Sequence, residues 1–196
     1  MTQFAEAAKG FTDLPIAVLA LVFAALAWKN GNKKAGAVFL FTGIGAIFGA
    51  VVHIFVLPPL IRKIVWTVLY VLLFESIRRF TVLFLGFIRP PKTVEKVLLI
   101  AAVSLYVVSL FFLYEIEAND ILVLILFALI CIAALIYSVI RYRYQNRYLV
   151  PFFGLAGSAA LLQIPGDRFP IFVVLEHFCL FAALFIVYRM AKAENE

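Results

Sequence analysis

Residues 35–57 read AGAVFLFTGIGAIFGAVVHIFVL, and this stretch contains no Asp, Glu, Lys or Arg. Lipid offers no partner to free backbone groups, so a chain crosses about 30 Å of hydrocarbon as a helix of about 20 apolar residues. The stretch is continuously apolar rather than alternating, which excludes a strand of a membrane β-barrel. It therefore predicts a transmembrane helix over Ala35–Leu57.

Six further runs of this kind occur along the chain, separated by short connections that contain Asn, Gly and Pro. The seven predicted spans are Asp13–Trp28, Ala35–Leu57, Ile61–Ile88, Val94–Tyr114, Ile121–Ile140, Tyr148–Ile164 and Phe169–Tyr188. For the first span, Thr12 and Asp13 provide a capping side chain and Pro15 stands in the first turn, so this helix is predicted to start there. The chain is expected to be all-α, a single seven-helix transmembrane domain over residues 1–196.

The composition excludes a soluble fold. Of the 196 residues, 66% are hydrophobic and 14% are charged, and the mean hydropathy is +1.10. Soluble domains average roughly 45–50% apolar and about 25% charged residues. A multi-pass integral protein of the cell membrane, with membrane lipids as its partners, is expected instead.

The distribution of Lys and Arg predicts the orientation, because basic residues collect in cytoplasmic loops. Eleven lie on the side of the C-terminus: Lys29, Lys33, Lys34, Arg89, Lys92, Lys96, Arg141, Arg143, Arg147, Arg189 and Lys192. Four lie on the opposite side: Lys9, Arg62, Lys63 and Arg168. The N-terminus is therefore expected outside and the C-terminus in the cytoplasm.

Tyrosines and arginines alternate over residues 141–148, a pattern that also occurs where proteins stack on nucleic acid. Here the stretch falls between two predicted spans, where a belt of aromatic and cationic side chains at the membrane surface explains it. No nucleic-acid partner is expected.

Small residues predict the faces on which helices pack, because they let two backbones approach closely in lipid. Ala17, Ala20, Ala24 and Ala27 share one face of the first predicted span. In the second span, Gly45, Gly49 and His53 follow one another at four-residue steps. His53 is therefore expected to face the helix bundle.

Charged groups inside predicted spans are candidates for function, because they persist in lipid where they pair or do work. Glu75 precedes Arg78 and Arg79 by three and four residues, so this intramembrane charge cluster can neutralise itself on one helix face. The arginines are also within snorkelling reach of the cytoplasmic headgroups. A structural role and a place in a central pocket both remain open for the cluster.

Both histidines fall inside spans, at similar depths from the outer surface. His53 lies roughly 7.5 Å below the outer end of its span, and His177 lies roughly 12 Å below the same surface. Asp13 stands at the outer mouth of the first span, and Glu176 adjoins His177. These four residues predict a polar pocket in the outer half, which could hold a metal, exchange a proton or join helices by hydrogen bonds.

Three short motifs carry a family resemblance: Thr12-Asp13-Leu14, the stretch from Gly49 to His53, and Glu176-His177 followed by Tyr188-Arg189. With seven spans and an outside N-terminus, the chain resembles the CREST superfamily, which contains the alkaline ceramidases and the adiponectin receptors. Small bacterial seven-span members look closest.

The resemblance implies zinc as a cofactor in members with hydrolase activity. Such members bind the metal through a span-two histidine and a span-seven H-x-x-x-H pair, with a serine four residues before the first histidine. His53 matches the first ligand and His177 matches one of the pair. The other partner is Val173 or Phe181 here, and Gly49 occupies the serine position. Glu176 or Asp13 would have to supply a third ligand.

Two functions follow as expectations. The first is a membrane protein without enzymatic activity, acting as a receptor, carrier or scaffold, whose polar pocket takes a small lipid-like ligand. The alternative is a membrane-embedded, metal-dependent lipid amide hydrolase of the CREST kind. The absence of a complete set of zinc ligands favours the first.

Overall fold

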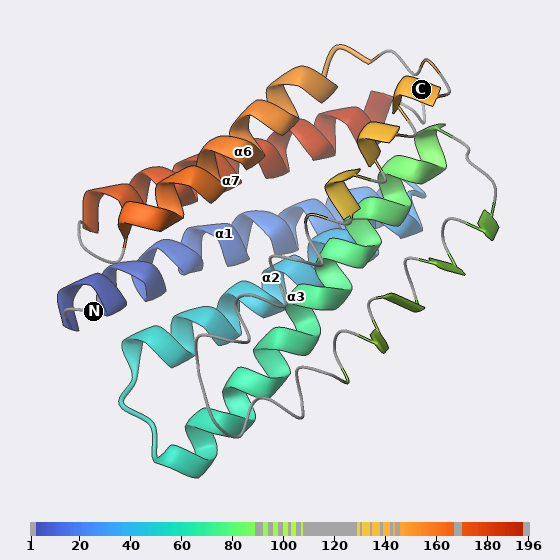
Figure 1. Cartoon of the computed structure of the whole chain (residues 1–196). Helices are drawn as coiled ribbons and strands as arrows, with labels where there is room; N and C mark the ends of the chain where they lie inside the picture. Colours follow the sequence, from blue (N-terminus) through green and yellow to red (C-terminus); the bar gives the residue numbers. More distant parts are fainter. Residues whose placement is uncertain are drawn as a thin grey trace. The chain divides into compact units, whose positions relative to one another are not determined.

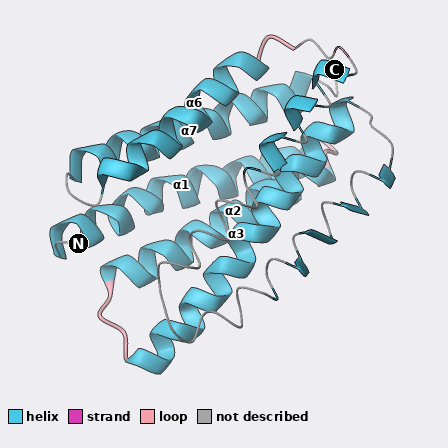
Figure 2. Ribbon diagram, viewed as in Figure 1, coloured by secondary structure: helices cyan, strands magenta, loops and turns pink. Residues whose placement is uncertain are grey.

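The computed structural model describes residues 3–88, 146–166 and 170–193 continuously, with parts of 92–107 and 129–143. Every regular element among these residues is an α-helix (Figure 2), which confirms the predicted all-α class. The helices are α1 (Gln3–Lys29), α2 (Lys33–Ile54), α3 (Pro59–Ile88), α6 (Leu149–Gly166) and α7 (Pro170–Ala193). The predicted spans Val94–Tyr114 and Ile121–Ile140 lie largely outside the described residues.

The chain divides into two compact units, one formed by residues 1–69 with 146–196 and the other by residues 70–145. In the first unit, α1 packs against α2 and α7, and α6 packs against α7 (Figure 1). The second unit includes the part of α3 from residue 70 onward.

Three helices in the described part of the chain are long and apolar enough to cross a membrane: Ala7–Lys29, Lys33–Ile54 and Ile171–Ala193. Helix α3 is longer than any of these, but charged residues near its start and in its second half interrupt the apolar run. Any window of 18 residues within α3 contains at least three of Arg62, Lys63, Glu75, Arg78 and Arg79.

The exposed faces of α1 and α7 are built from large apolar side chains, which is the reverse of a water-soluble helix. Along α1 the exposed residues are Phe11, Leu14, Val18, Val22 and Leu26, and along α7 they are Ile171, Leu175, Phe178, Phe181 and Phe185. The buried face of α1 is mostly small: it contains Ala17, Ala20, Ala24 and Ala27, together with Ile16 and Phe23. Large apolar groups outside and small ones between helices are typical of packing in lipid, so the fold indicates membrane association.

Helix α1 starts ten residues earlier than its predicted start, so the interpretation of Thr12-Asp13 as a helix start is wrong. The hydroxyl of Thr12 donates to the carbonyl oxygens of Ala8 (2.8 Å) and Lys9 (2.9 Å), inside a helix that begins at Gln3. Threonine can satisfy itself in this way because its side chain reaches the carbonyl of the preceding turn. The correction places Asp13 well inside α1.

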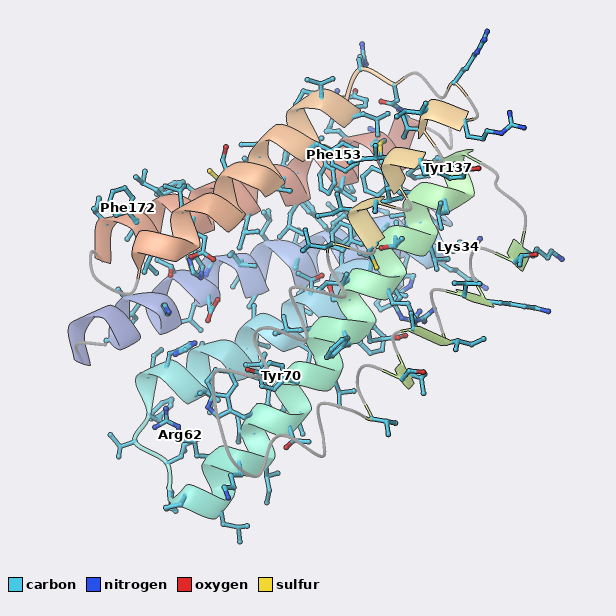
Figure 3. The ribbon with its side chains drawn as sticks, viewed as in Figure 1. Lys34, Arg62, Tyr70, Tyr137, Phe153 and Phe172 are labelled. Carbon is cyan, nitrogen blue, oxygen red and sulfur yellow. The ribbon has the colours of Figure 1, made fainter. Side chains whose placement is uncertain are left out.

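Contacts at both ends fix α1 and α7 parallel to each other. At one end Asp13 contacts His177. At the other, Asn32 donates its backbone N–H to the Ala27 carbonyl (2.8 Å) and its side-chain amide to the Ala191 carbonyl (3.3 Å). The two contacts are fourteen residues apart on each helix, or about 21 Å. In Figure 3, Phe172 marks the end of these helices at which Asp13 lies, and Lys34 marks the opposite end, at which Asn32 lies.

Candidate functional site

The centre of the site is a contact between the first and last helices. The Oδ1 atom of Asp13 lies 3.1 Å from the Nε2 atom of His177. Only 17% of the Asp13 side chain and 11% of the His177 side chain are exposed. Asp13 precedes Ala17 by one turn on the packing face of α1, and His177 follows the fully buried Val173 by one turn on α7. Both groups are therefore held between apolar helices.

The hydrogen bonds of His177 define the protonation of the pair. Its Nδ1 atom lies 2.8 Å from the carbonyl oxygen of Val173. A carbonyl oxygen only accepts, so Nδ1 carries a proton and donates it. The contact between Nε2 and Oδ1 then also needs a proton, which resides on the imidazole or on the carboxyl group. In both arrangements the pair is neutral overall and shares one proton.

A third helix closes the site through Gly49 of α2. A Cβ atom on this glycine would stand 2.7 Å from Oδ2 of Asp13 and 3.3 Å from its Cγ. Real Cβ atoms do not approach an oxygen so closely, so the carboxylate occupies the space that a side chain at position 49 would fill. Asp13 thus contacts His177 with one oxygen and the backbone of α2 with the other.

His53 has a different environment, one helical turn after Gly49. Its ring meets the ring of Trp66 edge-on, with centroids 5.7 Å apart. On the side of α1, a Cβ atom at Gly10 would lie 3.2 Å from the Cβ of His53. His53 therefore packs between α1 and the beginning of α3, and the pocket that it was expected to share with His177 stays a prediction.

The donor set does not match the zinc site that the resemblance implies. A catalytic zinc site has three protein ligands and a water. Among the described residues, no three His, Cys, Asp or Glu side chains gather as such a group. Asp13 and His177 supply two donor atoms, which already contact each other. Glu176 precedes His177 on α7 and points about 100° away from it around the helix.

The predicted charge cluster is a compact ion-pair network on α3. Both carboxylate oxygens of Glu75 accept from Arg78, through Nε and Nη2 at 2.7 Å each. Arg79 donates its Nε to Oε1 of the same carboxylate at 2.5 Å. One carboxylate thus serves two guanidinium groups, and these three residues together carry one positive charge.

Sequence reasoning missed two members of the site, Gly49 as a contact of Asp13 and the Val173 carbonyl as the acceptor for His177. The second follows from α-helical spacing, because Val173 lies four residues before His177. The first had a weaker signal, the glycine stripe on α2, which indicates a close approach but not the residue that makes it.

The comparisons with known proteins give a family but no function. The family described as "Family of unknown function (DUF6962)" matches residues 8–196. No curated protein and no solved structure matches the chain.

Proposed function

This chain belongs to the DUF6962 family of unknown function, and we propose that it is a seven-span membrane carrier without enzymatic activity. Its working site is the Asp13–His177 pair, which holds one exchangeable proton between the first and last helices. The observation that carries the proposal is the contact of Oδ1 with Nε2 inside helices that are apolar enough to span a membrane. Ionisable groups in such a place commonly mark proton relays and substrate paths.

The direction of the helices supports seven spans. Because α1 and α7 are parallel, the number of crossings from α1 through α7 is odd. Helix α2 returns from the Asn32 end to the Asp13 end, and α6 runs antiparallel to α7 after a short connection. Residues 59–148 must then cross an odd number of times. Three crossings fit, because α3 is followed by the apolar runs Val94–Tyr114 and Ile121–Ile140.

The partition of basic residues supports the orientation. Eleven Lys and Arg residues fall on one side of the seven spans and four on the other. This ratio favours the Asn32 end of the helices at the cytoplasm and the Asp13–His177 end in the outer half of the bilayer. Because little of the chain lies outside its predicted spans, a substrate would reach the pair from the bilayer. This favours a small lipid-like molecule as the substrate.

The shared proton makes the contact between α1 and α7 sensitive to protonation. Adding a second proton gives a carboxylic acid beside an imidazolium, which has a net positive charge in an apolar setting. Removing the proton leaves two acceptors, Oδ1 and Nε2, facing each other. Both changes weaken the contact, because each leaves a buried polar group charged or unpaired. The pair can therefore close α1 on α7 in one protonation state and release it in others.

Charged and titratable groups on the same and neighbouring helices influence the pH range over which the Asp13–His177 pair gains or loses a proton. Lys9 precedes Asp13 by one turn on α1, His53 follows Gly49 by one turn on α2, and Glu176 adjoins His177 on α7. A substrate that donates or accepts a hydrogen bond at Nε2 or Oδ1 would compete with the pair and couple its own binding to the proton.

The lipid amide hydrolase of the CREST resemblance is the competing function. It would use the Nε2 atom of His177 as a ligand, for which the Nδ1 contact with Val173 is the usual orienting contact. It also needs ligands that the described residues do not bring together.

Spin labels on the exposed faces of α1 and α7 would test the proposal directly. Phe11 and Ile171 are 62% and 60% exposed near the Asp13–His177 end. They are replaced by cysteine in a chain whose Cys131 and Cys179 are serine, and the protein is placed in lipid vesicles. The distance between the labels is measured from about pH 3.5 to about pH 9, which brackets the ordinary titration of carboxyl and imidazole groups. A matched Asp13→Asn/His177→Gln chain can keep a neutral hydrogen bond.

The proposal expects the label distance to lengthen toward both pH extremes in the parent chain and to stay constant in the Asp13→Asn/His177→Gln chain. A distance independent of pH in the parent chain would overturn the proton role. Zinc at one equivalent in the purified protein, with lipid amide hydrolysis that His177→Gln abolishes, would replace the carrier by the hydrolase.

A further inference from the structure

Two arginines, one from the turn before α6 and one from α7, converge on Tyr148, at the end of the first unit opposite to Asp13 and His177. The Nη2 atom of Arg147 donates to the hydroxyl of Tyr148 at 2.9 Å, and its Cζ lies 4.9 Å from the centre of the same ring. Arg189 of α7 also lies close to this hydroxyl, and the hydrogen bond from Arg147, together with the positive charges of both arginines, holds the pKa of Tyr148 below its ordinary value. The result is a pair of guanidinium groups around one phenol oxygen.

The backbone holds Tyr148 in place for this contact. Its N–H donates to the side-chain oxygen of Asn146 at 2.9 Å, and its carbonyl accepts from the N–H of Phe152 at 3.1 Å in the first turn of α6. The tyrosine therefore presents its hydroxyl from a fixed turn at the start of the helix. Arg189 reaches it from the last turns of the neighbouring α7.

The surroundings of this pair are cationic. The contact of Asn32 with Ala191 brings the start of α2 beside the end of α7. The exposed cations at this end are Lys29, Lys33, Lys34, Arg147, Arg189 and Lys192. In the described segments 27–34, 146–152 and 185–193 there is no Asp or Glu. Glu194 and Glu196 follow in the sequence, outside the described residues. Nothing in these segments neutralises the two guanidinium groups.

We propose that Arg147, Tyr148 and Arg189 bind the phosphate group of an anionic phospholipid. Guanidinium groups match the geometry of phosphate oxygens and bind them through parallel N–H bonds. The hydroxyl of Tyr148 sets the separation of the two arginines, and the Tyr148 ring packs against the guanidinium group of Arg147. The ends of membrane-spanning helices lie at the depth of the headgroups, and basic clusters there attract anionic lipids.

This inference rests on the proposed function only for the placement of the helices in a bilayer. It does not need a proton at Asp13–His177 or transport of a substrate. A protein that is recovered from membranes but does not discriminate between lipids would refute the phosphate site and leave the carrier proposal intact. A protein recovered as a soluble monomer would refute the carrier.

The test uses the full chain, purified in a neutral detergent at physiological salt, and fluorescent phosphatidic acid as the probe. Unlabelled phosphatidic acid, phosphatidylcholine and inorganic phosphate serve as competitors. The parent chain should bind the probe, release it to phosphatidic acid and retain it against phosphatidylcholine. Arg147→Gln/Arg189→Gln should weaken binding by about 30-fold, because each surface cation contributes roughly a factor of five.

Two matched variants separate a defined site from diffuse positive charge. Lys33→Gln/Lys34→Gln removes the same charge from the same end but leaves Tyr148 and its arginines, so it should weaken binding clearly less. Tyr148→Phe removes only the hydroxyl that positions the arginines and changes no charge, so it should weaken binding several-fold. Equal losses in the two double variants, with no effect of Tyr148→Phe, would overturn the site. Displacement by inorganic phosphate as effective as by phosphatidic acid would assign a soluble anion instead of a lipid.

Discussion

The Oδ2 atom of Asp13 lies 2.7 Å from the position that a Cβ atom would have at Gly49, which is too close for any residue that carries one. We predict that Gly49→Ala moves the carboxylate and weakens its contact with His177. Extra methyl groups in a packed interface typically cost about 1–3 kcal/mol. The unfolding midpoint in detergent should fall accordingly, although alanine favours a helix more than glycine does.

Gly154 in α6 provides the matched control, because nothing lies within 4 Å of a Cβ at that position. Gly154→Ala should leave the midpoint unchanged or raise it, through helix propensity alone. The loss in Gly49→Ala should shrink in a chain that already carries Asp13→Ala, because the methyl group then meets no carboxylate. An undiminished loss in that background would mean that the contact with Asp13 is not the cause.

The bond between Asp13 and His177 should appear as a coupling energy. We predict that Asp13→Ala and His177→Ala each destabilise the protein, and that the double variant is less destabilised than the sum. Interhelical hydrogen bonds in membranes couple by about 1 kcal/mol, and up to about 2. The free energy of unfolding measured in mixed detergent and denaturant gives the cycle.

A control cycle uses Val18→Ala and Phe178→Ala, two residues on the outward faces of the same helices that are 64% and 67% exposed. These changes should be additive. A zero coupling energy for Asp13 and His177 would contradict the shared proton, because two groups that exchange a proton cannot be independent.

The sequence predicted the helical class and the packing faces because both depend on local spacing. The alanines of α1 lie at steps of three and four residues, and the apolar runs far exceed what a soluble helix needs. The start of α1 was missed because residues 3–12 contain Glu6 and Lys9 and lower the local hydropathy, while Thr12 resembles a cap. Its internal bond to Ala8 cannot be read from composition.

That single error explains why Asp13 was expected at the mouth of the polar pocket and not at the level of His177. With α1 starting at Asp13, the carboxylate belongs at the mouth of the bundle, several ångströms above the imidazole. With α1 starting at Gln3, Asp13 lies ten residues, or about 15 Å, along the helix and reaches the level of His177. A depth in the membrane that is counted from a helix end has the same error as the position of that end. The pairing of α1 with α7 depends on packing over the whole chain.

The cluster on α3 offers a prediction that ranks its two arginines. Arg78 donates to both oxygens of Glu75 and its side chain is 18% exposed, whereas Arg79 donates to one oxygen and is 33% exposed. We predict that Arg78→Gln destabilises the protein more than Arg79→Gln does. Glu75→Gln should cost the most, about 1–3 kcal/mol, because it leaves both guanidinium groups without their carboxylate. Thermal unfolding in detergent compares the three.

Adding Arg78→Gln to Glu75→Gln should recover part of that loss, since the second change removes a guanidinium group that the first deprived of the Glu75 carboxylate. Strict additivity of the two would indicate that Glu75 stabilises the protein through other neighbours. The same ranking at high salt would support a buried network, whose ions are screened less than surface pairs.

The parallel arrangement of α1 and α7 makes a topological prediction with two separable parts. Reporters fused before Met1 and after Glu196 should lie on opposite sides of the membrane, because two parallel spanning helices at the ends of a chain require an odd number of crossings. The reporter after Glu196 should be cytoplasmic, because the proposed seven-span arrangement puts eleven basic residues on its side and four on the other. Accessibility to a membrane-impermeant thiol reagent at single cysteines in both tails measures each side.

Tails on the same side would contradict the crossing number and the seven-span proposal with it. Tails on opposite sides but inverted would keep the bundle and contradict only the charge argument, which would put Asp13 and His177 in the cytoplasmic half and the Tyr148 site at the outer surface.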